Sequence, residues 1–330
     1  METPLITEEH YIETMKEEVE PWLATRRTVF CAKRANGQRL YCERYLAKEP
    51  RGVVLISHGF KESAAKYAES IWYFLHEGYH VYIPEHCGHG RSYRLVDDLS
   101  LVHVDSYKRY LSDLKAIARI ARRDVNRTAG GDLLPMYLYG HSMGGGIALA
   151  IAAQEPALFE RVVLSSPMIR PLCGPYPYRV MVVGSAALCA IGMSKDYCPG
   201  HHPYQGPENF AMSASLSRPR FDYYQEIKAA NPLFQTSAAS LGWAHAAAQL
   251  ERELMEHSAL DGDVPMLAFQ AEQDGSVSLT AMNDFVRKRN KNHPGSIRLQ
   301  RLPGTKHEIY NSSDSAVQPF WEELFAFISK

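Results

Sequence analysis

The sequence predicts an α/β protein, with a mostly parallel sheet flanked by helices and one long, mainly helical insertion. Short runs of apolar, largely β-branched residues recur along the chain, and such runs are typical of strands buried on both faces of a sheet. Stretches with apolar residues at helical spacing separate them, which favours parallel strands joined by helices. This alternation stops after Pro167 and resumes at Pro265, which indicates the insertion.

The first expected element is a hairpin over residues 26–46, because two strand-like runs flank Asn36-Gly37, the strongest short turn signal. Buried strands are then expected in the apolar runs over residues 53–60, 80–86, 136–142 and 161–167. Between them, apolar or small residues at helical spacing predict helices over residues 63–77, 107–121 and 144–153.

Residues 168–260 are rich in Pro, Gly, Tyr and Ala, and contain helical stretches but no strand of the earlier type. Strands are expected again over residues 265–274 and 296–304, and helices over residues 281–289 and 317–328. An insertion of roughly 90 residues is too long for a loop. The sequence therefore predicts a core formed by residues 1–167 and 261–330, and a helical cap formed by residues 168–260.

Composition and charge exclude several classes of protein. The formal net charge is −1, so no overall field attracts the chain to nucleic acid. The N-terminal segment is acidic and lacks the apolar stretch of a signal peptide. The longest apolar run, Val180–Met193, is too short to cross a bilayer. We expect a cytoplasmic protein with no transmembrane segment and no nucleic-acid partner.

The six cysteines form no Cys-x-x-Cys pair and no cluster with histidine at zinc spacing. A chain of this length needs no disulfide to be stable, so free, buried thiols are expected. We expect neither a metal ion nor another cofactor.

The pentapeptide Gly140-His141-Ser142-Met143-Gly144 lies between a predicted strand and a predicted helix of small residues. A serine in this context is raised on a tight turn next to the N-terminus of the helix, where it can act as a nucleophile. The alternative is a glycine-rich turn that only joins strand to helix. The strand-to-helix context favours Ser142 as a catalytic nucleophile.

A serine nucleophile needs a base and a third group that orients the base. In this arrangement the acid and then the histidine follow the serine along the chain, each after a strand. Asp274 and His307 hold these places. Glu272 and Asp263 compete for the role of the acid, but Glu272 falls inside the expected strand and Asp263 precedes it. Asp274 is therefore the predicted acid and His307 the predicted base.

Acyl transfer also needs hydrogen-bond donors for the negative oxygen of the intermediate. The backbone N–H of Met143, directly after the nucleophile, is the first candidate. The second is expected in the loop His58-Gly59-Phe60, where the first core run ends, at the N–H of Phe60. His58 in the same loop is expected to hold the loop by hydrogen bonding rather than to act as a base.

Three segments and two later residues together resemble a known family: HGFKESAAKY (58–67), EHCGHGRS (85–92), GHSMGG (140–145), and the late Asp274 and His307. They are similar to the bacterial lysophospholipases and monoacylglycerol lipases of the α/β-hydrolase class. The resemblance implies a capped α/β-hydrolase fold that cleaves a single acyl ester from glycerol or glycerophosphate without metal or cofactor. Glu85 and Cys87 depart from the family, which usually has Asp at the first position and Arg or Val at the second.

The expected function is therefore that of a serine carboxylic ester hydrolase acting on a lysophospholipid or a monoacylglycerol through an acyl-enzyme. An esterase for aryl esters of the feruloyl type is a second hypothesis. An aminopeptidase is a third, and it requires a cap carboxylate for the free amine of the substrate; Asp196, Glu208 and Asp222 are available. A non-catalytic ligand-binding protein is the fourth, since the fold hosts some.

The apolar run Val180–Met193 has two interpretations. It is either a buried helix of the cap, or the wall of a tunnel above Ser142 in which Gly184, Ser185, Ala186 and Ala187 leave room for an acyl chain. The substrate class also suggests transient contact of the cap with a membrane surface.

Overall fold

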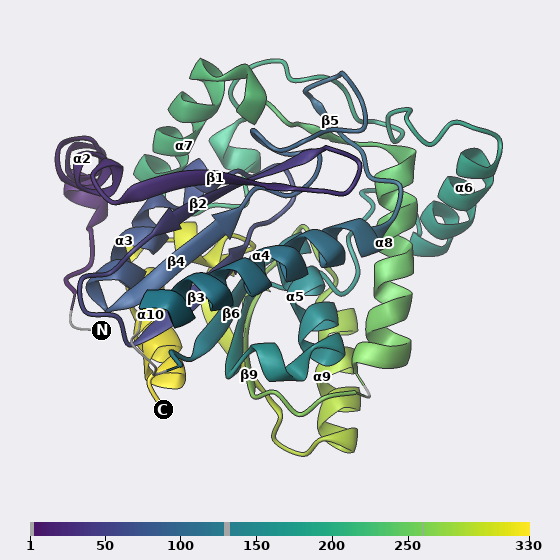
Figure 1. Cartoon of the computed structure of the whole chain (residues 1–330). Helices are drawn as coiled ribbons and strands as arrows, with labels where there is room; N and C mark the ends of the chain where they lie inside the picture. Colours follow the sequence, from purple (N-terminus) through teal and green to yellow (C-terminus); the bar gives the residue numbers. More distant parts are fainter. Residues whose placement is uncertain (1–2, 129–132, 260) are drawn as a thin grey trace.

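The structure is a computed structural model that describes residues 3–128, 133–259 and 261–330 (Figure 1). The described residues form an eight-stranded sheet in the order β1-β2-β4-β3-β6-β7-β9-β10. β2 runs antiparallel to both of its neighbours, and the pairs from β4 to β10 are parallel. The mostly parallel sheet predicted from the sequence is therefore confirmed. Its strands are β1 (Arg27–Lys33), β2 (Arg39–Tyr45), β3 (Gly52–Ser57), β4 (Tyr79–Pro84), β6 (Met136–His141), β7 (Arg161–Ser165), β9 (Met266–Gln273) and β10 (Ile297–Lys306).

Helices cover both faces of the sheet, because the central strands are apolar on both sides. In β3, Val53 and Leu55 belong to one hydrophobic cluster, whereas Val54 and Ile56 belong to the other. The first cluster lies under α4 (Tyr107–Thr128), α5 (Met143–Gln154) and α9 (Leu279–Asn292). The second lies under α3 (Ala68–His76) and α10 (Asp314–Ile328). A continuous apolar strand thus has a partner on each face, as expected for a parallel sheet.

The acidic N-terminal segment is helical and packs onto the second cluster. It consists of α1 (Tyr11–Thr14), a π-helical turn over residues 15–19 and α2 (Glu20–Ala24). Tyr11, Met15, Val19 and Leu23 are buried, and their spacing of four residues places them on one helix face. This segment was not among the elements expected from the sequence.

Residues 168–259 contain α6 (Tyr178–Ala190), α7 (Arg218–Ala230) and α8 (Leu241–Glu253). α8 packs against α4 and α5, whereas α6 packs against α8 and lies at the edge of the molecule (Figure 1). The segment also holds a short strand, β8 (Ala238–Ala239), which pairs with β5 (Leu101–Val102) in a separate two-stranded sheet. Two-residue strands are too short to produce a sequence pattern. Residues 1–2, 129–132 and 260, which the predicted division assigned to core or cap, lie outside the described residues.

The six cysteines all lie in the described part of the chain and are free, as expected; Cys42 and Cys87 are buried, and the other four are only partly so. In the described ranges, no helix combines the length and the apolarity needed to cross a membrane.

Candidate active site

Ser142 occupies the sharp turn between β6 and α5. Its backbone has φ 51° and ψ −121°, a conformation that non-glycine residues rarely adopt. Gly140 and Gly144 let the turn pack closely against the neighbouring backbone, because they carry no Cβ. A Cβ added at Gly144 would lie 2.0 Å from the Ser57 carbonyl oxygen, and one at Gly140 would lie 2.8 Å from the Gly144 carbonyl oxygen. These are backbone contacts that cannot move aside, so the motif requires glycine at both positions.

Ser142, His307 and Asp274 form a hydrogen-bonded chain. The distance from His307 Nε2 to Ser142 Oγ is 2.8 Å, and that from His307 Nδ1 to Asp274 Oδ2 is 2.7 Å. The other carboxylate oxygen of Asp274 accepts hydrogen bonds from the backbone N–H groups of Ser276 and Val277. The three residues follow β6, β10 and β9, so all lie at the carboxyl edge of the parallel strands.

The electrostatics keep Asp274 ionised. Burial raises its pKa, but the hydrogen bond and charge of His307 and the two backbone N–H groups outweigh burial, so the pKa is lowered overall. A carboxylate at this position fixes the proton of His307 on Nδ1. His307 Nε2 is then free to accept the proton of the Ser142 hydroxyl.

The competing residues lie in other surroundings. Glu272 is exposed and accepts a hydrogen bond from the N–H of Gly304. Asp263 is exposed as well. His58 Nδ1 donates to the carbonyl of Gly59, while its Nε2 accepts from the N–H of His86. His58 therefore ties the loop after β3 to the loop after β4, which is the supporting role expected for it.

The two expected oxyanion donors lie on elements that Trp243 of α8 holds together. Met143 is the first residue of α5, and the first N–H groups of an α-helix have no partner within the helix. The Phe60 ring packs on Trp243 with 4.3 Å between centroids, and Trp243 Nε1–H donates to Met143 Sδ. The residue that joins the two comes from the inserted segment, and sequence reasoning did not identify it.

A buried carboxylate, Glu62, organises the loop that carries Phe60. It accepts a 2.6 Å hydrogen bond from the N–H of Gly59 and a 2.8 Å hydrogen bond from Lys66 Nζ. The hydroxyl groups of Tyr67 and Tyr310 also donate to it. Three charged residues within six positions directly after an apolar strand are the sequence signal that could have indicated this cluster.

Lys66 connects this loop to the loop that carries His307. Besides Glu62, its ammonium group contacts Glu308 Oε1 at 2.6 Å, and Glu308 directly follows His307. Burial lowers the pKa of Lys66, but the two carboxylates outweigh burial and raise it overall. The pair of loops is thus fixed by a buried cation shared between two anions. Within the described ranges, no group of three or more His, Cys, Asp or Glu side chains could hold a metal ion.

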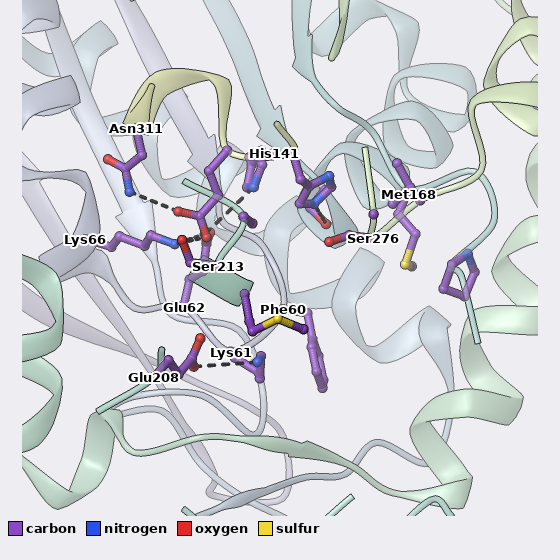
Figure 2. A pocket seen from close by; sticks show the side chains of 18 of the residues that line it. Phe60, Lys61, Glu62, Lys66, His141, Met168, Glu208, Ser213, Ser276 and Asn311 are labelled. Carbon is purple, nitrogen blue, oxygen red and sulfur yellow. Dashed lines mark hydrogen bonds and ion pairs between the residues drawn. The ribbon is translucent and has the colours of Figure 1, made fainter. Parts of the chain in front are cut away.

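Ser142 and His307 open onto a cavity of about 440 Å³ (Figure 2). Figure 2 shows Lys61, Lys66 and Glu208 on one side of this cavity and Met168 on the other. The apolar part of the wall consists of Phe60, Met168, Pro171, Leu172, Met212, Phe221, Trp243 and Val277. The charged part consists of Lys61, Glu62, Lys66, Glu208, Lys228 and Glu308.

The expected role of Val180–Met193 is wrong in both versions. The described residues that line the cavity include none from α6, so Gly184, Ser185, Ala186 and Ala187 form no tunnel wall above Ser142. The helix is not buried either, because 55% of Val180 and 69% of Val183 is exposed. Sequence reasoning equated apolar with buried, whereas here only one face of α6 packs against α8.

Comparison with known proteins places the chain in a family. The model of the Hydrolase_4 family, described as serine aminopeptidase, S33, matches residues 48–314. The monoacylglycerol lipase of Mycolicibacterium smegmatis is 26% identical over 266 residues, which cover 81% of this chain and 84% of the lipase. Lysophospholipase L2 of Escherichia coli K12 is 26% identical over 274 residues, which cover 82% of this chain and 78% of the lysophospholipase.

Solved structures have the same fold. The monoglyceride lipase of Saccharomyces cerevisiae superposes with a TM-score of 0.71 at 17% identity, over 92% of this chain and 94% of that one. A carboxyl esterase of Bacillus coagulans superposes with a TM-score of 0.70 at 18% identity, over 92% of this chain and 98% of the esterase. The chain therefore belongs to the Hydrolase_4 family of serine hydrolases with the α/β-hydrolase fold, and its expected resemblance to bacterial lysophospholipases and monoacylglycerol lipases is confirmed.

Proposed function

We propose that this enzyme is a carboxylic ester hydrolase that cleaves a single acyl ester from a monoacyl lipid, a lysophospholipid or a monoacylglycerol. The observation that carries the proposal is the hydrogen-bonded chain Ser142–His307–Asp274, of which Ser142 and His307 line a cavity with a partly apolar wall. The relatives named as monoacylglycerol lipase and lysophospholipase support the substrate class.

The reaction follows from the roles of the residues. Ser142 Oγ attacks the ester carbonyl while His307 Nε2 takes its proton, and the N–H groups of Phe60 and Met143 bind the negative oxygen. His307 then protonates the departing alcohol, which leaves an acyl-enzyme. Water, deprotonated by His307, attacks the acyl-enzyme. The fatty acid then leaves, and His307 returns the proton to Ser142 Oγ. Asp274 stabilises the charged imidazole in both steps.

We further propose that residues 168–260 act as a cap on a core formed by residues 1–167 and 261–330, and that the cap contacts the membrane that supplies the substrate. The exposed apolar residues of α6 and its C-terminal end support this contact. The residues Val180, Val183, Ile191 and Met193 are 39% to 73% exposed. A cytoplasmic location stays a prediction.

The aminopeptidase alternative needs a carboxylate that is free to bind the amine of a peptide. Of the three candidate carboxylates Asp196, Glu208 and Asp222, Glu208 lines the cavity. Its charge is already neutralised by Lys61 and Lys228. Asp222 pairs with Arg218 on the surface. These pairings favour esters over peptides with a free amine.

A substrate panel tests the proposal. Purified enzyme and its Ser142→Ala variant are assayed on lysophospholipids and monoacylglycerols with matched acyl chains, on feruloyl esters and on aminoacyl amides. We expect the monoacyl lipids to give the highest kcat/KM, and Ser142→Ala to lower kcat by about 10⁴-fold or more. If feruloyl esters or aminoacyl amides gave the highest kcat/KM, the enzyme would instead be an aryl esterase or an aminopeptidase. If the protein bound lipid without hydrolysing any substrate, it would be a non-catalytic protein.

A further inference from the structure

The charged side of the cavity contains two lysines that share one carboxylate. Lys228 Nζ lies 2.8 Å from Glu208 Oε1, and Lys61 Nζ lies 3.6 Å from the same oxygen. Lys66 in the same wall is matched by two carboxylates, Glu62 and Glu308. The group Lys61–Glu208–Lys228 therefore carries one positive charge in excess, whereas the group Glu62–Lys66–Glu308 carries one negative charge in excess. The excess of positive charge is thus local to one part of the wall of the cavity that holds Ser142.

The backbone at Lys61 adopts a conformation that is uncommon for a residue other than glycine. Lys61 has φ 63°, the left-handed region in which most side chains are strained and glycine is not. It follows Phe60 directly, so a strained residue with a cationic side chain stands next to an oxyanion donor. Strained residues of this kind cluster at active sites and ligand-binding sites.

Lys228 is a buried ammonium group, and burying a charged group costs free energy. Its side chain is 2% exposed, and burial lowers its pKa even though Glu208 is in hydrogen-bond contact. The pKa of Glu208, in contrast, is lowered to about 2, because the charges of Lys61 and Lys228 outweigh the effect of burial. Among the described residues, Glu208 is the carboxylate that pairs with Lys228, and it is shared with Lys61, so the two ammonium groups have one anion between them and can receive a second.

The donors on this side of the cavity are available to such an anion. At 3.6 Å the contact of Lys61 with Glu208 is longer than a hydrogen bond, and the Lys61 side chain is 34% exposed. His201 also lines the cavity, and its Nδ1 accepts a hydrogen bond from the N–H of Ala239. This contact places the proton of the neutral ring on Nε2, which is therefore a donor.

We propose that Lys61, Lys228 and Glu208 form a head-group subsite that selects substrates with a phosphate next to the glycerol, so that the enzyme prefers monoacyl glycerophosphates to neutral monoacylglycerols. The inference rests on the proposed function and narrows it. The acyl chain occupies the apolar side of the cavity near Met168, and the phosphate binds the ammonium groups on the opposite side (Figure 2). Phosphate accepts such charge-assisted hydrogen bonds with three oxygens.

The test compares the ratio of kcat/KM for 1-acylglycerol 3-phosphate to that for 1-acylglycerol with the same acyl chain. Lys61→Asn removes the charge and keeps a residue that tolerates positive φ. We expect it to lower the ratio by roughly tenfold to a hundredfold, the size of one hydrogen bond between charged groups. Glu208→Gln frees both lysines and should raise the ratio. Lys195→Asn, on an exposed lysine of the inserted segment that does not line the cavity, is the matched control and should leave it unchanged.

Opposite effects of Lys61→Asn and Glu208→Gln separate this subsite from a purely structural ion pair. Loss of a structural pair would slow both substrates by the same factor in both variants, and that result would overturn the inference. A ratio that neither substitution changes would overturn it as well.

A binding readout keeps the inference testable if the proposed function fails. In the Ser142→Ala background, glycerol 3-phosphate should raise the melting temperature more than glycerol or inorganic phosphate, and Lys61→Asn or Lys228→Met should abolish the difference. Equal protection by inorganic phosphate would indicate a site for free anions and contradict a head-group subsite. Absence of hydrolysis with intact protection would refute the proposed function alone.

Discussion

At Ser142 the backbone conformation of the sharp turn between β6 and α5 costs of order 1–3 kcal/mol for a residue other than glycine. Backbone hydrogen bonds on both sides of the residue hold this conformation. The Ser142 N–H donates to Ser165, and the Ser142 carbonyl accepts from Gly145 and Met168. The strand β7, the helix α5 and the start of the inserted segment thus hold the turn together. Local strain is stable here because three separate elements compensate for it.

The role of Asp274 can be tested against a matched neighbour. Asp274→Asn should lower kcat by roughly 10⁴-fold with little change in KM, because asparagine favours the wrong tautomer of His307. Glu272→Gln, two residues earlier and exposed, is the control and should have little effect. Steady-state kinetics on one monoacyl ester decide the matter, and a larger loss in the Glu272 variant would refute the assignment.

His141 gives the fold a pH dependence that can be measured. Burial lowers its pKa to about 4, against the partial opposition of Glu62. Because the pKa in the folded state is below that in the unfolded state, the folded protein binds fewer protons between about pH 6.5 and 4. Stability from this residue is therefore complete above about pH 6.5 and is lost as the pH falls through this window.

His141→Gln should accordingly flatten the loss of unfolding free energy between pH 6.5 and 4, by up to about 3 kcal/mol. Denaturant unfolding at a series of pH values measures it. His10→Gln, which changes a histidine whose side chain is 65% exposed, is the control. Parallel pH profiles of the parent and the His141 variant would contradict the burial argument.

Residues of the site could be predicted from the sequence where they follow a recognisable strand. Ser142, Asp274 and His307 each do, and the hydrogen bonds bring all three together. Lys61, Glu208 and Lys228 could not be grouped in this way. Their contact depends on how a segment about 150 residues further along the chain folds back over the loop after β3.

At the scale of elements, the long apolar strands were predictable because each must be buried on two faces. The strands β5 and β8, with two residues each, carry no such signal. The helix α6 shows a different limit. Its sequence is apolar enough for a core, and nothing in the sequence says that one face remains uncovered.

The exposed face of α6 leads to a prediction about membrane contact. Val183→Asp should weaken binding to vesicles of phospholipid and lysophospholipid by about tenfold, because burying a valine in the lipid interface contributes roughly 1–2 kcal/mol. Hydrolysis of a short, water-soluble ester should be spared. Flotation or sedimentation with the vesicles measures binding.

Val29→Asp is the matched control, since Val29 is 48% exposed but lies on β1 rather than on α6. Equal loss of vesicle binding in the two variants, or none in either, would exclude α6 as the contact surface.

Across the whole molecule, the inserted segment is fixed to the rest by contacts of two kinds. Trp243 of α8 packs on Phe60, which lies in the loop after β3. Arg220 of α7 is fully buried, where it pairs with Glu69 of α3 and Asp314 of α10. Removing one partner from such a buried pair leaves an uncompensated charge, which costs several kcal/mol. The inserted segment therefore forms one wall of the cavity as a fixed part of the fold.

The central claim is that Ser142 is the nucleophile through which this molecule hydrolyses esters, and covalent labelling tests it most directly. The enzyme is treated with an alkyl fluorophosphonate, and intact-protein and peptide mass spectrometry measure the number and position of adducts while hydrolysis of a monoacyl ester is followed. The account predicts one adduct per chain, on the peptide containing Ser142, with activity lost in proportion to labelling. Full labelling of Ser142 with hydrolysis undiminished, or loss of activity with Ser142 unmodified, would contradict it.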